Sequence, residues 1–274
     1  MPRVPSGNHQ SYWGGGTVLS RERILVGGAP GTGKTYGWLT IARMLPQVTF
    51  HVLDPDDGVR RVKDADFPDV KNLNYYLTPT WFGEPKVDDS VTVCGISNAL
   101  TTIRKVVKPN DWIILEMLSS FWSLAQGGFV EEVFNEGIGE YFLQARKELR
   151  TNAKRLEALR GWTDWSVINK MHNDDFMNVV CYRLPAHVYM TTSVSIASQA
   201  GEEDAEVRAF YGDSKIRFEG QKYTPWRAQS VLLFHKDRAG WKYSTFLKDR
   251  GRTFVDAEPL YSFAEQYLVG VAGW

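Results

Sequence analysis

The pattern of apolar and polar positions predicts strands and helices that alternate along the chain. Short apolar, β-favouring runs predict strands at 24–26, 48–53 and 112–115. Further strands are expected at 73–77, 90–95, 186–195, 229–237 and 241–252, with a turn at 238–240 between the last two. Alternation of this kind indicates an α/β fold, with a central, mostly parallel sheet covered by helices on both faces. The last two strands predict a C-terminal antiparallel extension.

Apolar residues at helical spacing predict helices at 36–45, 96–108, 130–160 and 165–184, and a short one within 262–274. The third of these carries basic residues towards its end, which form either a solvated face or a nucleic-acid contact. They are Arg146, Lys147, Arg150, Lys154 and Arg155. The polar stretch 196–226 lacks a helical period, and we expect a long excursion of the kind that is functional or mobile in compact domains.

The loop between the first strand and the first helix has the strongest chemical signal. It reads G-x-x-x-x-G-K-T, a pattern whose backbone amides wrap the phosphates of a nucleotide. Lys34 is expected to reach the β and γ phosphates and Thr35 to bind Mg²⁺. Such glycines also occur in ordinary turns, but the flanking strand and helix favour an ATP site. The predicted ATP-binding residues are Gly28, Ala29, Pro30, Gly31, Thr32, Gly33, Lys34 and Thr35.

Composition limits the range of functions. The chain has 274 residues, 43% of them hydrophobic, which is enough for one large core. Lys and Arg number 32 and so do Asp and Glu, so any nucleic-acid site must be local rather than a property of the whole surface. Cys94 and Cys181 lie in apolar contexts and are expected to be free thiols of the core.

The ends and the location of the protein are predicted from composition as well. Residues 1–22 are rich in Gly, Pro, Ser and Asn, which favours a flexible arm before one domain at 23–274. No run approaches the ~18 apolar residues that span a bilayer, and the first residues lack an apolar signal core. We therefore expect a cytoplasmic protein with no membrane partner.

Two carboxylates are candidates for the chemistry of nucleotide hydrolysis, which needs an acid for Mg²⁺ and a carboxylate that orients water. Glu116 ends the strand "WIILE", where an aspartate is usual, and its longer stem can act through water. Asp54 and Asp56 in "LDPDDG" are expected on one face because strand residues alternate, so Asp56 is predicted to orient the water. The alternatives are a buried edge glutamate and a solvated acidic turn.

The order of several segments resembles that of RecA-like ATPases. These segments are "GGAPGTGKT", "LDPDD", "WIILEMLSSFW", "MTTS" and "FLKDRGR". They are most similar to the phage-encoded RecA-like ATPases of the single-strand-annealing recombination class, which also resemble the core of DnaB-type helicases. The likeness covers roughly residues 23–252. It implies a RecA-like P-loop fold for 23–274, ATP hydrolysis in DNA recombination or replication within the host cytoplasm, and a homo-oligomeric ring or filament.

The resemblance also implies roles for single residues. Gly28 to Thr35 match the Walker A loop, Glu116 the Walker B acid on the metal side, and Asp56 the catalytic glutamate. Thr192 stands at the sensor position, where RecA has a glutamine. Lys248 and Arg250 match a K-x-R pair that reaches the ATP of a neighbouring subunit, although they also suit a surface hairpin with solvated charges.

The excursion matches the mobile DNA-binding loop of these ATPases. Single-strand binding combines cations with stacking rings, and the excursion contains Arg208, Phe210, Tyr211, Lys215, Arg217, Lys222, Tyr223, Trp226 and Arg227. Lys215, Arg217, Lys222 and Arg227 are therefore predicted to contact single-stranded DNA. An ordinary polar loop with a few core aromatics is the alternative.

Two other functions use the same phosphate loop. One is an ATP-dependent motor or assembly factor for virion morphogenesis or DNA packaging, which would act on duplex DNA or protein. The other is a small-molecule P-loop kinase, but no arginine-rich lid stands out in the sequence. An ATPase acting on single-stranded DNA is the function that we expect.

Overall fold

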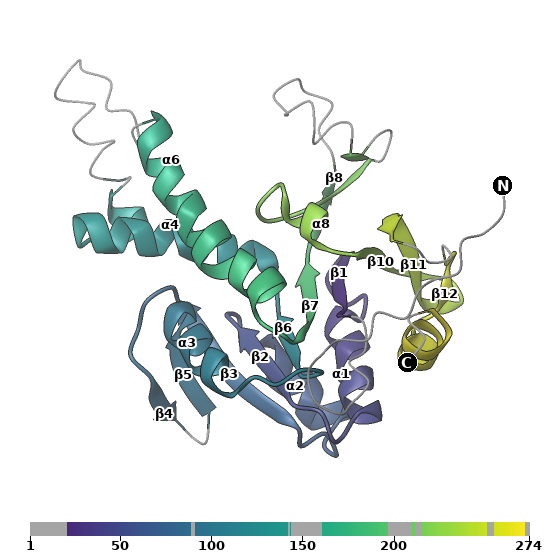
Figure 1. Cartoon of the computed structure of the whole chain (residues 1–274). Helices are drawn as coiled ribbons and strands as arrows, with labels where there is room; N and C mark the ends of the chain where they lie inside the picture. Colours follow the sequence, from purple (N-terminus) through teal and green to yellow (C-terminus); the bar gives the residue numbers. More distant parts are fainter. Residues whose placement is uncertain are drawn as a thin grey trace, which may run out of the picture.

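The computed structural model describes residues 21–88, 91–141, 143, 161–196, 210–211, 215–250 and 255–271. Within them a ten-stranded sheet has the order β12-β11-β10-β1-β7-β6-β2-β3-β5-β4 (Figure 1). Its strands from β10 to β5 in that order are parallel: β1 Arg23–Gly28, β2 Phe50–Asp54, β3 Leu73–Thr80, β5 Val91–Gly95, β6 Trp112–Leu115, β7 His187–Thr192 and β10 Ser230–Asp237.

The two ends of the sheet are antiparallel. β4 Lys86–Asp88 pairs with β5 at one end. At the other end β11 Gly240–Asp249 pairs with β10, and β12 Glu258–Pro259 pairs with β11. The predicted mostly parallel sheet and its C-terminal antiparallel extension are thus confirmed, whereas the sequence pattern did not predict β4.

Helices cover both faces of the sheet and enclose two separate cores. One core packs under α1 Lys34–Met44, α2 Gly58–Asp66 and η4 Ala264–Val271. The other packs under α3 Ile96–Val106, α4 Leu118–Phe134, α6 Gly161–Asn169, η1 Lys170–Met177 and η2 Val179–Arg183. In β1, Ile24 and Val26 face the first core and Leu25 the second. Coverage on both sides explains why the central strands read as continuous apolar runs.

The expected third helix, 130–160, is interrupted at 135–137, and residues 138–141 and 143 are helical again. The structure has α4 from Leu118 to Phe134, and the backbone of Asn135 is left-handed (φ 54°) where the helix ends. A pair of glycines, Gly127 and Gly128, obscured this helix in the sequence. Gly128 permits close packing, because a Cβ there would lie 2.6 Å from the Cβ of Trp81. The basic residues expected near 146–155, like the arm at 1–20, lie outside the described residues.

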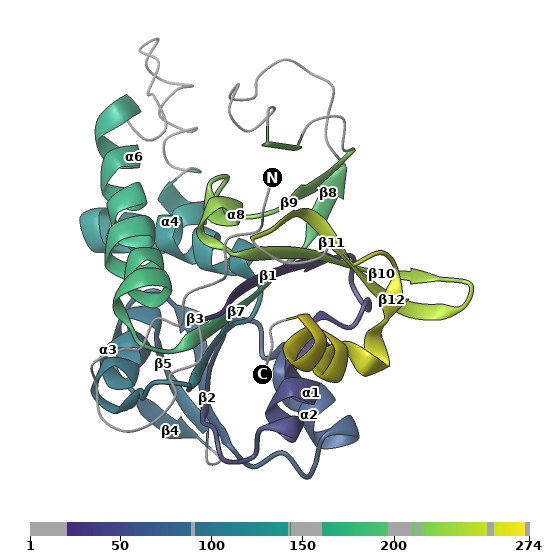
Figure 2. The same cartoon turned by 45° about the vertical axis from the view of Figure 1, so that its right-hand side comes forward.

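The long excursion is more regular at its two ends than the sequence suggested. β8 Val194–Ile196 and β9 Ile216–Phe218 form an antiparallel pair beyond the end of β7 (Figure 2), and the short helix α8 Thr224–Arg227 follows. Phe218 stacks on Phe246 of β11 with ring centroids 5.4 Å apart. It also lies against Gly27 of β1. Residues 197–209 and 212–214 fall outside the described part of the chain.

The structure also bears on the two cysteines and on membrane-spanning helices. Cys94 and Cys181 are buried and form no disulfide, as predicted. In the part of the chain that the structure describes, no helix has the length and apolar character needed to cross a bilayer.

One side-chain amide reaches three carbonyls at and beyond the end of α1. The side-chain N–H₂ of Asn72 donates to the carbonyls of Ala42 (3.1 Å), Leu45 (2.9 Å) and Val48 (2.8 Å), which lie at and beyond the helix end. Since helix ends leave carbonyls without intrahelical partners, we predict that Asn72→Ala lowers the free energy of unfolding by about 1–3 kcal/mol. Urea denaturation measures this. Asn98→Ala, which removes one exposed bond to Gly83, is the control and should cost less. An Asn72→Ala protein with the wild-type midpoint would contradict this assignment.

Candidate functional site

The candidate residues meet at the edge of the sheet where the parallel strands end. There β1 leads into the loop 29–33, β2 ends at Asp54, β6 is followed by Glu116 and β7 ends at Thr192. The chain passes from β1 to β2 across β7 and β6, which lie between them in the sheet. Open α/β sheets bind ligands outside the carboxyl ends of their strands.

The glycine-rich loop has the backbone that the sequence pattern requires. Gly31 (φ 75°) and Gly33 (φ 90°) are left-handed, a conformation that side chains with a Cβ rarely adopt. The hydroxyl of Thr32 donates to the carbonyl of Ala29 (2.8 Å), which keeps the turn tight. Helix α1 starts directly after the loop at Lys34. The predicted succession of strand, loop and helix is therefore confirmed.

Lys34 folds back over the loop. Its ammonium donates to the carbonyls of Gly28 (2.7 Å) and Ala29 (3.1 Å) and is buried. Burial lowers the pKa of Lys34, and the carboxylates of Glu116 and Glu219 oppose that shift. A positive charge thus lies beside the loop, close to two acids.

Glu116 lies in contact with the helix that follows the loop. Its Oε1 accepts from the hydroxyl of Thr35 (2.7 Å) and its Oε2 from the indole N–H of Trp38 (2.9 Å). The residue is only 3% exposed, and burial raises the pKa of its carboxyl. The two hydrogen bonds and Lys34 counteract this shift, whereas Asp54 adds to it. The sequence-predicted residues Lys34, Thr35 and Glu116 are thus brought together.

The pair of Thr35 and Glu116 fits Mg²⁺. Mg²⁺ prefers oxygen ligands, and in nucleotide sites it takes one or two protein oxygens together with phosphates and water. A hydroxyl and a carboxylate in direct contact supply such oxygens. Among the described residues no group of three or more His, Cys, Asp or Glu side chains gathers as a metal site of another kind.

The expectation that Asp54 and Asp56 share a face was wrong. Strand β2 ends at Asp54, so alternation does not continue through Pro55. Asp54 is buried and accepts from the amides of Asp56 (3.1 Å) and Val59 (2.9 Å) and from the hydroxyl of Tyr75 (2.8 Å). Asp54 therefore shapes the turn, while Asp56 is exposed beyond it.

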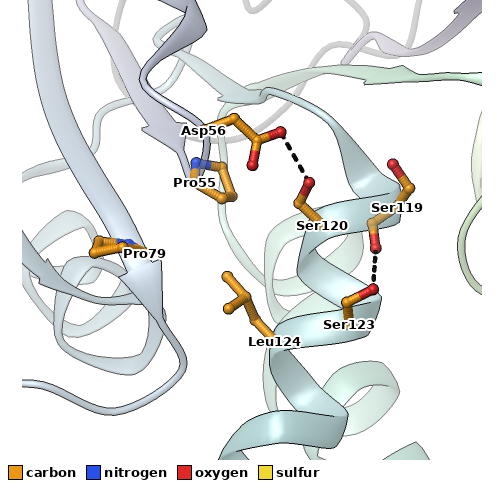
Figure 3. A pocket seen from close by; sticks show the side chains of 7 residues that line it. All are labelled: Pro55, Asp56, Pro79, Ser119, Ser120, Ser123 and Leu124. Atoms are coloured by element: carbon orange, nitrogen blue, oxygen red, sulfur yellow. Dashed lines mark hydrogen bonds between the residues drawn. The ribbon is translucent and has the colours of Figure 1, made fainter. Parts of the chain in front are cut away.

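Asp56 faces a pocket of about 330 Å³ (Figure 3). The hydroxyl of Ser120 donates to its carboxylate at 2.9 Å. The pocket lies between the turn after β2, the end of β3 and the first turns of α4, and it is lined by Pro55, Asp56, Pro79, Ser119, Ser120, Ser123 and Leu124. These serines were not predicted from the sequence, although "SS" soon after the strand-end Glu116 was a signal for them.

Adjacent threonines at the end of β7 hold two different segments. The hydroxyl of Thr191 accepts from the amide of Met117, directly after Glu116 (2.8 Å). The hydroxyl of Thr192 donates to the carbonyl of Glu219, directly after β9 in the excursion (2.8 Å). Thr192, the expected sensor, thus connects the excursion to a strand that lies beside β1.

The residues predicted to contact nucleic acid have different environments. Lys215 and Lys222 are exposed, and the ammonium of Lys222 lies 4.9 Å from the ring centre of Tyr223. Arg217 lies over the ring of Tyr211 at 5.9 Å. The guanidinium of Arg227 donates to Asn173 of η1 (3.1 Å), so this cation contacts the protein's own helix.

The aromatic residues of the excursion contact one another. The ring centroid of Trp226 lies 4.3 Å from that of Phe210 and 5.6 Å from that of Tyr223. Tyr211 is buried. These rings therefore form a small packed cluster. This agrees with the alternative interpretation of the excursion, a polar loop with a few core aromatics. Arg208 lies outside the described residues.

Lys248 and Arg250 lie away from the phosphate loop of their own chain. Lys248 is level with Val231 of β10 and hence with Leu25, near the start of β1. Its ammonium donates to the carbonyls of Pro225 (3.3 Å) and Trp226 (3.1 Å) in α8. Burial, with repulsion from Arg250 and Arg23, lowers the pKa of Lys248 to about 8. Arg250 is exposed.

Two tryptophans of the site were not found from the sequence. Trp241 at the start of β11 donates its indole N–H to the carbonyl of Gly31 (3.0 Å), a contact between distant segments that leaves no local signal. Trp38 follows Thr35 by three residues, and that helical spacing could have placed it beside Glu116. No protein-family model matches the sequence, and no curated protein matches it significantly.

The buried carboxylate of Glu116 should make the free protein less stable at neutral pH. Its pKa is raised above the ordinary 4.5, so the folded state binds a proton more readily than the unfolded state. The free energy of unfolding then falls as pH rises from 4.5 through the folded pKa. We predict that Glu116→Gln raises the Tm of the nucleotide-free protein at neutral pH, and that the gain shrinks on acidification.

Thermal melts in a series of buffers measure this effect. Glu131→Gln, on the exposed side of α4, is the control and should leave Tm nearly unchanged. A lower Tm for Glu116→Gln at neutral pH would show that the ionised carboxylate stabilises the fold.

Proposed function

We propose that this protein is a RecA-like ATPase that binds Mg·ATP at Gly28 to Thr35, hydrolyses it and acts on single-stranded DNA. The observation that carries the proposal is the meeting of three residues at one edge of the sheet. Lys34 lies over a loop with two left-handed glycines, and Thr35 next to it is hydrogen-bonded to Glu116. Phosphate binding needs the first arrangement and Mg²⁺ binding the second.

Each of these groups has a chemical role in the proposed site. The loop amides and the N-terminus of α1 bind phosphate oxygens, since both present N–H groups and a positive dipole. Lys34 neutralises the β and γ phosphates. Thr35 and Glu116 would hold Mg²⁺, and the bound ion would supply positive charge to the phosphate oxygens.

Asp56 is the proposed water-orienting base. Its carboxylate is exposed, is held by Ser120 and lines an open pocket. A positioned carboxylate accepts the proton of an attacking water and typically contributes ~10²- to 10⁴-fold to the rate. The pocket leaves room for water beside it.

The excursion is the proposed contact with single-stranded DNA. Lys215 and Lys222 are exposed cations on this segment. The hydroxyl of Thr192 holds its last part through Glu219, and the charge of Glu219 acts on Lys34. These contacts support coupling between DNA binding and the phosphate loop.

The distribution of cations supports ATP sites shared between subunits of a ring or filament. Arg250 is exposed, and its backbone amide donates to the carbonyl of Gln229, which lies near the start of β1 rather than at the loop that follows the end of β1. A second copy of the chain is the partner whose nucleotide Arg250 would reach. Lys248 differs from it, because its ammonium already contacts α8.

We predict that the protein hydrolyses ATP with Mg²⁺ and that single-stranded DNA raises the turnover more than duplex DNA does.

Lys34→Ala should abolish nucleotide binding in calorimetry, whereas Lys105→Ala on the exposed side of α3 should not change it. Unchanged affinity in Lys34→Ala would overturn the phosphate site. Stimulation by duplex DNA alone would favour the motor, and turnover that depends on a small hydroxylated acceptor would favour the kinase.

Shared sites lead to a further prediction about mixtures. Arg250→Ala and Lys34→Ala should each be nearly inactive, because an arginine supplied in trans is worth ~10³- to 10⁵-fold in turnover. Mixing the two proteins should restore activity, since some interfaces then combine an intact loop with an intact arginine. Size-exclusion chromatography confirms that the two proteins co-assemble. A co-assembled mixture that stays inactive would show that Arg250 does not act across subunits.

A further inference from the structure

The acid next to the phosphate loop is held by two donors from one helix. The Oε1 of Glu116 accepts from Thr35 and its Oε2 from the indole of Trp38, at 2.7 Å and 2.9 Å. Trp38 is fully buried, so it is enclosed by protein and its polar contact in the site is with Glu116. Thr35 and Trp38 are three residues apart on α1, on the same side of the helix.

The indole of Trp38, the second donor, restrains the long side chain of Glu116. A glutamate has one more rotatable bond than an aspartate, so its carboxylate can turn away from the loop. Leaving one buried carboxylate oxygen without a donor is also costly. The indole N–H satisfies Oε2 and thereby keeps Oε1 at the hydroxyl of Thr35.

We propose that Trp38 is a positioning residue that makes glutamate a competent metal-side acid in this site. It acts through Glu116 and does not touch the nucleotide. The inference rests on the proposed Mg·ATP site. The hydrogen bond from the Trp38 indole to Glu116 contributes to the part of the nucleotide affinity that depends on Mg²⁺.

The test compares ATP binding with Mg²⁺ and with a chelator, measured by calorimetry on the full chain. Trp38→Phe keeps an aromatic ring and removes the N–H donor. We expect the gain in affinity from Mg²⁺ to fall by about tenfold, the size of one lost hydrogen bond to a charged group. The affinity for metal-free ATP should stay within about twofold, because the loop and Lys34 are unchanged.

The matched control is Trp112→Phe, another fully buried tryptophan, at the opposite end of β6 from Glu116. It should leave the gain from Mg²⁺ unchanged. In the double variant Trp38→Phe/Glu116→Gln, the losses in the gain from Mg²⁺ should not add, since both substitutions break the same contact between Trp38 and Glu116. Additive effects would overturn the proposal.

A second variant tests the same idea if Trp38→Phe does not fold. Glu116→Asp shortens the side chain so that it no longer reaches both donors, and its gain from Mg²⁺ should fall. An aspartate that binds Mg·ATP as well as the wild type would overturn the role of Trp38. So would a Trp38→Phe protein that loses affinity equally with and without Mg²⁺, because that result describes a merely structural residue. A wild type without Mg·ATP affinity would overturn the proposed function itself.

Discussion

The arrangement of the site depends on the burial of the Glu116 carboxylate. A charged group between two covered faces of a sheet must be paired, since an unpaired one costs several kcal/mol. Both of its hydrogen-bond donors, Thr35 and Trp38, belong to α1. These two hydrogen bonds join α1 to the end of β6, although β7 separates β6 from the strand that precedes α1, and they add to the apolar packing of α1 on the sheet. The loop before α1 is held in addition by its left-handed glycines and by the indole of Trp241.

The charged residues of the candidate site lie at two different edges of the sheet. The carboxyl edge carries Asp54, Asp56 and Glu116 around the phosphate loop. Near the amino end of β1, Arg23 and Lys248 donate to carbonyls of α8. The positive charge of Arg250 is close enough to help lower the pKa of Lys248. Within one chain these cations lie apart from the acids. In the proposed assembly a second copy would bring these cations to those acids, which is a heterologous contact of the kind that closes into a ring or extends into a filament.

Much of the fold could be predicted because its signals are local. The parallel sheet followed from apolar runs alternating with helical periods, and the phosphate loop followed from glycines that need positive φ. The bounds of α4 could not be predicted, because its glycine pair reads as a breaker until Trp81 packs against Gly128. The order at the ends of the excursion was also hidden, since Phe218 finds Phe246 and Gly27 only in the folded chain.

By itself the sequence determined the central parallel strands and the strand, loop and helix around the glycine-rich loop, because these elements and the glycine conformations depend on neighbours along the chain. Tertiary structure decided the division of roles among them. It buried Asp54 in a turn and left Asp56 exposed, and it placed Trp38 on Glu116 and Trp241 on Gly31. It also anchored Lys248 on α8 and left Arg250 exposed. These outcomes depend on contacts between segments far apart in the chain, which form only when the sheet brings their strand ends to one edge.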